Sequence, residues 1–171
     1  MIVVVVGVSG CGKSTVGAAV AEGLGTPFLE GDAVHPAADV AKMRAGHPLT
    51  DADREPWLRL LAERVHAAAG SGQGLVVACS ALKRRYREVL RAAAPDVRFL
   101  HLVLDRDTAR RRVAARTGHF MPAALVDSQF DDLEPLEPDE PGATVDAAGD
   151  PGTTLALARA AVARFGDERT A

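Results

Sequence analysis

A glycine-rich segment directly after the N-terminal apolar run carries the most specific chemical signal in this chain. Residues 7–15 read Gly-Val-Ser-Gly-Cys-Gly-Lys-Ser-Thr and follow the run Ile2–Val6. This is the phosphate-loop pattern G-x-x-x-x-G-K-[ST] in the context that it needs, a strand leading into a helix. Backbone N–H groups of such a loop bind phosphate oxygens, the lysine reaches the terminal phosphates, and the first hydroxyl is offered to Mg²⁺. The predicted nucleotide-binding residues are Gly7, Ser9, Gly10, Cys11, Gly12, Lys13, Ser14 and Thr15.

A second group of polar residues follows the second predicted strand. Gly31-Asp32 comes directly after the strand pattern at 27–30, and His35-Pro36 follows shortly afterwards. Because the carboxyl ends of parallel strands meet at one edge of a sheet, Asp32 is expected beside the phosphate loop. Its carboxylate there could orient a substrate hydroxyl, accept the hydroxyl proton late, or hold Mg²⁺. The alternative is that Asp32 caps a turn, as aspartate after glycine often does.

The third predicted strand, at 75–79, ends in Cys-Ser rather than in an acidic residue. The metal-binding role therefore falls to Ser14 and Asp32, which favours a small-molecule kinase over a motor ATPase. The segment that follows is rich in side chains that can donate hydrogen bonds to an anion. Ser80 and Lys83 lie nearest the strand end and are the predicted substrate contacts. The arginines at 85 and 87 are predicted to form a solvated cationic face.

Two arginines near residue 115 suggest a lid. Arg112 and Arg116 are four residues apart and so lie on one helix face, and Gly118 breaks the pattern just beyond them. Cations placed before a flexible segment could close over a triphosphate and neutralise the transferring group. We expect residues 117–132 to be mobile without ligand and to close over ATP, bringing Arg116 to the phosphates. The alternative is a surface helix in which these arginines pair with nearby aspartates.

Composition limits the classes of partner. The chain has 171 residues and a formal net charge of −3, so it fits one domain and has no basic excess for nucleic acid. No apolar run approaches the roughly 20 residues that span a bilayer. The two cysteines have no metal-ligand or disulfide spacing, which fits a reducing cytoplasm. The expectation is a cytoplasmic protein with no nucleic-acid or membrane partner.

Alternating strand and helix signals predict an α/β fold with a mainly parallel sheet. The predicted strands are 2–6, 27–30, 75–79, 97–104 and 143–146. The predicted helices are about 14–23, 37–44, 50–70, 82–93, 107–117 and 153–165, with the fifth capped by Asp107 or Thr108. Asp105, at the end of the fourth strand, is also interpreted as a helix-capping acid. The acidic, proline-containing stretch at 131–142 is predicted to be a mobile surface connection.

Several blocks together resemble the gluconokinases of the phosphate-loop type. They are residues 7–15, Gly-Asp-x-x-His-Pro from 31, Lys-Met at 42, Gly-His-Pro-Leu from 46, Asp-Ala-Asp-Arg-Glu-Pro-Trp-Leu from 51, Cys-Ser-Ala-Leu-Lys from 79, Arg116 with Gly-His-Phe from 118, and Gln-Phe from 129. They span about three-quarters of the chain in the family's order. The resemblance implies a P-loop NTPase fold of the nucleoside-monophosphate-kinase type, a three-layer sandwich with a five-stranded parallel sheet and a lid. The substrate-binding region would be about 32–60 and the lid about 117–132.

The resemblance also implies an activity, transfer of the ATP γ-phosphoryl group to the 6-hydroxyl of D-gluconate with Mg²⁺. Lys13, Asp32 and Arg116 would be catalytic, and Arg112 and Arg116 would contact the nucleotide. Gluconate is an anion, and Arg54 and Lys83 are the cations available for its carboxylate. The full set implied for the substrate is Asp32, His35, Arg54, Ser80, Lys83, His119 and Gln129. Members of this family often form dimers, so the resemblance implies a homodimer as well.

Two other classes of function stay open at this point. One is a kinase for another small hydroxy acid such as shikimate, although that family has an Asp-x-Asp pair where this chain has Asp-Ala-Val from residue 32. The other is a nucleotide-binding regulator without transfer activity. Binding alone does not require Asp32 or the lid arginines, which favours an enzyme.

Overall fold

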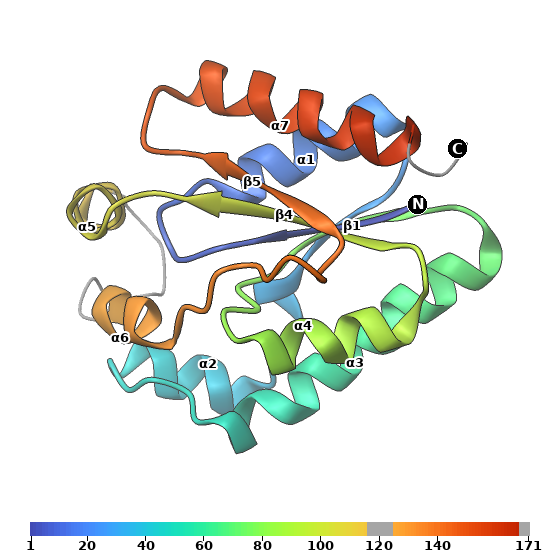
Figure 1. The fold of residues 1–171 in the computed structure, drawn as a ribbon. Coiled ribbons are helices and arrows are strands. Elements are labelled where there is room, and N and C mark those ends of the chain that lie inside the picture. Colours follow the sequence, from blue (N-terminus) through green and yellow to red (C-terminus); the bar gives the residue numbers. More distant parts are fainter. Residues whose placement is uncertain (116–124, 168–171) are drawn as a thin grey trace.

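The fold is a three-layer α/β/α sandwich whose middle layer is a five-stranded parallel sheet (Figure 1). The computed structural model describes residues 1–115 and 125–167. Its strands are β1 (Ile2–Val6), β2 (Phe28–Glu30), β3 (Leu75–Ala78), β4 (Val97–Val103) and β5 (Gly142–Asp146), in the spatial order β2-β3-β1-β4-β5. Its helices are α1 (Lys13–Leu24), α2 (Ala37–Arg44), α3 (Asp51–Ser71), α4 (Arg84–Ala93), α5 (Arg106–Ala114), α6 (Leu125–Asp132) and α7 (Pro151–Asp167), with a short 3-10 helix at Gly31–Val34.

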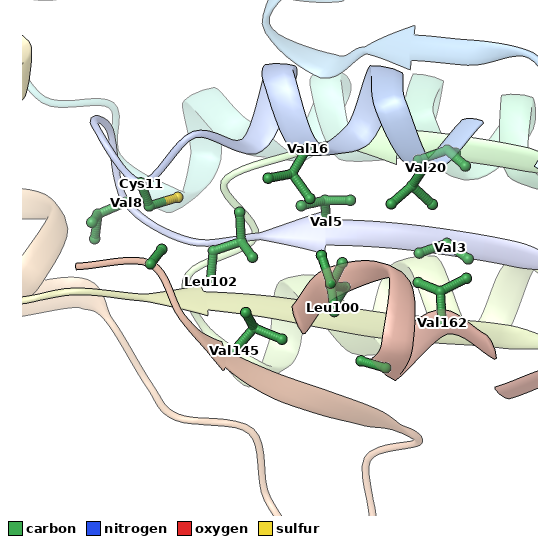
Figure 2. Close-up of a cluster of buried hydrophobic side chains, with 14 of the residues drawn as sticks. Val3, Val5, Val8, Cys11, Val16, Val20, Leu100, Leu102, Val145 and Val162 are labelled. Carbon is green, nitrogen blue, oxygen red and sulfur yellow. The ribbon is translucent and has the colours of Figure 1, made fainter. Parts of the chain in front are cut away.

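The central strand β1 is buried on both faces, which explains its unbroken apolar sequence. Val3 and Val5 face α1 and α7, and Figure 2 shows them packed among Val16, Val20 and Val162. The alternate residues of β1 face the opposite layer, where α3 and α4 cover the sheet with Trp57, Leu61 and Leu90 among others. Full burial of one such valine contributes about 1.5–3 kcal/mol, so the two cores anchor the strand from which the phosphate loop begins.

The carboxyl ends of the strands meet at the edge of the sheet where α2, α5 and α6 lie (Figure 1). The close approach of β2 to β3 at this edge needs glycine, because a β-carbon on Gly31 would collide with the carbonyl oxygen of Ala78. The carbonyl of Gly31 also accepts a hydrogen bond of 2.8 Å from Nε1 of Trp57. Both contacts fix the backbone just before Asp32. None of the helices in the described ranges is long and apolar enough to cross a membrane.

Most predicted elements are confirmed to within about two residues, and β1 and α2 have the predicted bounds. Helix α3 begins at a capping box, in which Thr50 and Asp53 bond each other's backbone N–H groups. The predicted cap of α5 at Asp107 or Thr108 was wrong. The cap is Asp105, whose carboxylate accepts a 2.8 Å hydrogen bond from the backbone N–H of Thr108. The interpretation of Asp105 as a helix-capping acid is thus confirmed. Helix α6 was not predicted as a helix.

The predicted solvated face on α4 was wrong for Arg87. This side chain is 1% exposed and makes a two-point ion pair with Glu140, through Nε at 2.6 Å and Nη2 at 2.8 Å. Its guanidinium also donates hydrogen bonds to backbone carbonyls of two segments. These are Leu82 in the β3–α4 loop, and Glu134 and Pro135 in the acidic stretch. The acidic stretch at 131–142 is therefore fastened to the β3–α4 loop, and its prediction as a mobile connection was wrong as well.

Candidate active site

A cleft opens at the carboxyl edge of the sheet and collects most of the predicted site residues. Predicted residues in its wall are Ser9, Lys13, Asp32, His35, Arg54, Ser80 and Gln129. The wall is completed by Met43, Pro48, Leu49, Leu125 and Ser128, which were not predicted. Residues from the phosphate loop, the 3-10 helix, α2, α3, the β3–α4 loop and α6 thus meet in one place.

The phosphate loop has the backbone that the motif predicts. Gly12 caps the N-terminus of α1 with φ of 95°, a left-handed conformation that favours glycine. Lys13 is the first residue of α1, and its Nζ donates to the carbonyl of Val8 across the loop at 3.0 Å. Ser14 and Thr15 are exposed at the start of the same helix. The helix N-terminus, the loop and the ammonium group together form an anion-binding site.

Gln129 connects α6 to the phosphate loop. Its Oε1 accepts a 2.6 Å hydrogen bond from the backbone N–H of Ser9, and the residue is 7% exposed. Because an N–H group can only donate, this bond fixes which end of the carboxamide faces the loop. The NH₂ end has no partner among the described residues and is left as a hydrogen-bond donor for a ligand.

Arg54 is the most unusual side chain of the cleft. It is 7% exposed, and its Nε is buried without any hydrogen-bond partner. Within the described part of the chain its guanidinium forms no ion pair, and it lies 5.7 Å from the ring of Tyr86. A buried, unpaired cation costs several kcal/mol. An anionic ligand in the cleft would supply the missing partner.

Asp32 and His35 form the opposite, acceptor-rich side of the cleft. The carboxylate of Asp32 accepts no hydrogen bond from any described residue, so it does not act as a turn cap. The ring of His35 stacks on Trp57 with centroids 4.2 Å apart and an interplanar angle of 12°. Burial lowers the pKa of His35 below its usual value, although Asp32 and Asp39 act in the opposite direction. The lowered pKa favours the neutral form of the imidazole.

The β3–α4 loop brings Ser80 into the cleft and leaves Lys83 outside its wall. The Nζ of Lys83 is 2.9 Å from Asp132 and 3.3 Å from Asp51, and these partners raise its pKa. Of the two cations predicted for a substrate carboxylate, Arg54 alone lines the cleft. The thiol of Cys79, at the end of β3, is fully buried, which raises its pKa to about 12 and keeps it protonated.

A second and larger cleft lies on the other side of the phosphate loop. Its wall includes Gly10, Cys11, Gly12, Thr15, Val16, Arg112, Ala115, Pro151, Gly152, Thr154 and Leu155. Arg112 donates to the carbonyls of Ala147, Ala148 and Gly149 at 2.7–3.0 Å. This predicted nucleotide contact is thus held by the β5–α7 loop, and its alternative pairing with aspartates is not seen.

The lid prediction falls partly outside the described residues. Arg116, His119 and the segment 117–124 lie there. The remaining part of the predicted lid, 125–132, is α6, which buries Leu125 and Val126 and carries Gln129. Ion pairs from Arg106 and Arg110 of α5 to Asp127 hold α6 on its outer side.

Comparison with known proteins identifies the family of the chain. A family model described as an AAA domain matches residues 2–136. The gluconokinase of Gluconobacter oxydans is 47% identical over 152 residues, which cover 89% of this chain and 85% of that protein. The thermosensitive gluconokinase of Escherichia coli is 43% identical over 80% of this chain and 73% of its own length. The chain belongs to the gluconokinase family.

A solved structure extends the family match to the fold. The crystal structure of a gluconokinase from Sinorhizobium meliloti has a TM-score of 0.89 and 43% identity, and the match covers 99% of this chain and 95% of that one. The match therefore includes the C-terminal part after residue 131, which carries weak sequence signals.

Several residues that line the cleft in the structure could not be recognised as cleft residues from the sequence. Met43, Pro48 and Leu49 lie within blocks that carried the resemblance, yet they are apolar and look like core residues in sequence. Met43 and Leu49 form a small buried cluster with Leu125, and all three line the cleft together with Pro48. Asp39, which approaches His35 but does not line the cleft, was not predicted either, although it follows His35 at the i, i+4 spacing that places two side chains together.

Proposed function

We propose that this phosphate-loop kinase transfers the γ-phosphoryl group of ATP to the 6-hydroxyl of D-gluconate, giving 6-phospho-D-gluconate and ADP. The observation that carries the proposal is the unpaired guanidinium of Arg54 in a cleft that also holds Lys13 and Asp32. A sugar acid has a carboxylate that can pair with Arg54 and hydroxyl groups that can donate hydrogen bonds to Asp32. Family membership supports the same substrate. Cys11 and Cys79 are both free and buried, which suits a reducing cytoplasm.

Arg54 would bind the substrate carboxylate. Its guanidinium offers parallel N–H groups that match a carboxylate, and burial strengthens the resulting charge-assisted bonds. The fixed NH₂ group of Gln129 would donate to a hydroxyl of the chain, and Ser80 would add a hydroxyl of its own. The carboxylate end is thereby fixed, and the far end of the six-carbon acid is directed toward the phosphate loop.

Asp32 would act on the hydroxyl that is phosphorylated. Its free carboxylate can accept a hydrogen bond from the 6-hydroxyl, hold the oxygen in line with the γ-phosphorus and accept the proton as the new bond forms. Lys13 would stabilise the negative charge that develops on the transferring group. Phosphoryl transfer depends mainly on such positioning and electrostatic stabilisation.

Mg²⁺ fits the donors that the chain offers. The hydroxyl of Ser14 is exposed at the N-terminus of α1, and the carboxylate of Asp32 is free, so both are oxygen ligands of the kind Mg²⁺ prefers. No group of three or more potential metal ligands occurs within residues 1–115 and 125–167, so phosphate oxygens and water would complete the coordination. When bound, the ion supplies positive charge to the phosphate oxygens.

The second cleft would hold the nucleoside of ATP. It adjoins the phosphate loop at Gly10 and Gly12, and its far wall is the start of α7. Its apolar side chains, Val16, Ala115 and Leu155, suit the face of a base. Arg112, fixed by three carbonyls, closes one end of this cleft.

Replacing Arg54 by methionine tests the carboxylate site. We expect the KM for gluconate to rise about 10- to 100-fold, since a charged hydrogen bond contributes about 1.5–3 kcal/mol, while the KM for ATP stays close to wild type. The melting temperature should stay the same or rise, because methionine removes an unpaired buried charge without leaving a large cavity. Steady-state kinetics and thermal unfolding measure both. A weaker affinity for ATP with unchanged gluconate kinetics would place Arg54 on the nucleotide side.

Asp32→Asn tests the hydroxyl-orienting role. Asparagine keeps the size of the side chain and removes its charge, so we expect kcat to fall on the order of 10²-fold with little change in the KM for gluconate. Stability should be nearly unchanged, because the carboxylate has no hydrogen bond to lose in the described structure. A variant that melts at a lower temperature but retains kcat would support a structural role instead.

A substrate panel tests the function as a whole. ADP release would be followed at fixed Mg²⁺ and ATP with gluconate, glucose, shikimate, AMP and adenylylsulfate. The proposal expects gluconate to give the highest kcat/KM, and glucose, which lacks the carboxylate, to be a poor substrate. A clear preference for any other member of the panel would overturn it.

A further inference from the structure

Two buried polar atoms face each other beside the cleft, and neither has another partner. They are Nδ1 of His35 and Oδ2 of Asp39, 3.6 Å apart. The side chains of the two residues are 3% and 9% exposed, so water does not satisfy them. Buried polar atoms are almost always hydrogen-bonded, and a shift of about half an ångström would join this pair.

The orientation of the His35 ring is fixed by contacts on two sides. Stacking on Trp57 holds the plane of the ring, and the indole is itself tied to the carbonyl of Gly31. Within that plane Nδ1 lies toward Asp39, and Nε2, on the far side of the ring, is the nitrogen left to the cleft. The charged groups around the ring are Asp32, Asp39 and Arg54.

We propose that Asp39 is a positioning residue, whose carboxylate accepts the Nδ1–H of His35 and so leaves Nε2 as an acceptor for a substrate hydroxyl. A neutral imidazole has one donor and one acceptor nitrogen, and the partner of one nitrogen decides the role of the other. Because a carboxylate can only accept, Asp39 selects the tautomer with the proton on Nδ1. The identity of the ligand rests on the proposed function, whereas the tautomer does not.

The assignment explains how the cleft distinguishes a polyol acid from a simple anion. Arg54, Lys13 and the NH₂ group of Gln129 are donors, so without Nε2 the acceptors would be few. With Asp39 in place, His35 adds an acceptor on the same side as Asp32. Asp32 and His35 can then each accept a hydrogen bond from a hydroxyl group of the sugar acid.

The first test is the tautomer itself, read from long-range ¹H–¹⁵N correlations of the histidine rings in the full-length protein without substrate. The His35 signals would be assigned with a His35→Gln variant. The proposal expects Nδ1–H in the wild type, and a loss of that form in Asp39→Asn, whose carboxamide can donate to Nδ1. A wild-type ring with its proton on Nε2 would overturn the proposal.

The second test is a double-mutant cycle on kcat/KM for gluconate. Asp39→Asn should lower it about tenfold or more, the scale known for carboxylates that orient metal-ligating histidines, with the KM for ATP near wild type. In a His35→Gln background the same change should have an effect of less than about twofold, because Asp39 acts through His35. Asp107→Asn, an exposed aspartate of α5, is the matched control and should behave as wild type.

The outcomes separate the possible failures. Equal losses in both backgrounds would show that Asp39 does not act through His35, and a lower melting temperature with unchanged kinetics would show a purely structural role. If the tautomer is as expected and another acid proves to be the substrate, the positioning role stands and the proposed function fails.

Discussion

Replacing Lys13 by alanine is expected to reduce kcat for phosphoryl transfer on the order of 10²–10³-fold, the usual loss for one group that stabilises charge in the transition state. The ammonium group lies in the cleft wall and has one hydrogen bond within the protein, to the carbonyl of Val8. A single such bond contributes only about 1 kcal/mol, so the melting temperature should fall by a few degrees at most. Lysine is also the compact charge that the narrow loop accommodates, so Lys13→Arg should not restore full activity.

Single-turnover measurements at saturating Mg²⁺ and ATP would quantify the loss, with thermal unfolding recorded in parallel. Arg59→Ala is the matched control, because it removes a cation that is 68% exposed and does not line either cleft. Near wild-type turnover in Lys13→Ala with an intact fold would show that the loop binds phosphate without contributing to transfer.

Breaking the buried pair of Arg87 and Glu140 is expected to have the largest effect on stability. Glu140→Ala leaves the guanidinium of Arg87 charged, 1% exposed and without its counter-ion, which costs about 3–5 kcal/mol. In a domain of this size that corresponds to a fall in melting temperature of roughly 10 °C or more. Arg54→Met, at the other buried arginine, should not destabilise the fold, so the two variants should change the melting temperature differently.

The same pair makes stability depend on pH in a defined direction. Burial alone would raise the pKa of Glu140, but the hydrogen bonds from Arg87 and the backbone N–H of Glu137 lower it below the ordinary value of 4.5. A lowered folded-state pKa means that the contribution is fully present above about pH 4.5 and is lost as the pH falls further. Glu140→Gln should therefore unfold with a weaker dependence on pH in this acid range than the wild type. Equal acid dependence and equal melting temperatures in Glu140→Ala and wild type would contradict the assigned role of the pair.

The sequence predicted the phosphate loop, the order of elements and most of the cleft because these depend on local patterns. The apolar run of β1 and the motif after it are continuous in sequence, and Asp32 and Ser80 could be placed from the rule that parallel strands end at one edge. Arg54 came from the resemblance together with the charge of the implied substrate. In each case the necessary signal lay within a few residues of the predicted feature.

The parts that were missed depend on contacts between distant segments. Arg87 looked like one of several surface arginines because Glu140, its partner, is 53 residues away. The acidic stretch that contains Glu140 looked mobile for the same reason. Helix α6 has eight residues and a weak apolar pattern, and it is held by Gln129 at the phosphate loop and by ion pairs to α5. The ion pairs of Lys83 with Asp51 and Asp132 also join segments that are distant in sequence, so they could not be predicted.

The position of the transferred phosphoryl group tests the central claim most directly. Uniformly ¹³C-labelled D-gluconate would be incubated with the enzyme, Mg²⁺ and ATP, and the product examined for ¹³C–³¹P coupling. A carboxylate held by Arg54 and a distal hydroxyl held by Asp32 predict coupling at C6 and at its neighbour C5, with none at C1 or C2. Coupling centred on any other carbon would contradict this orientation of the substrate, and the absence of a phosphorylated product would contradict the proposed function itself.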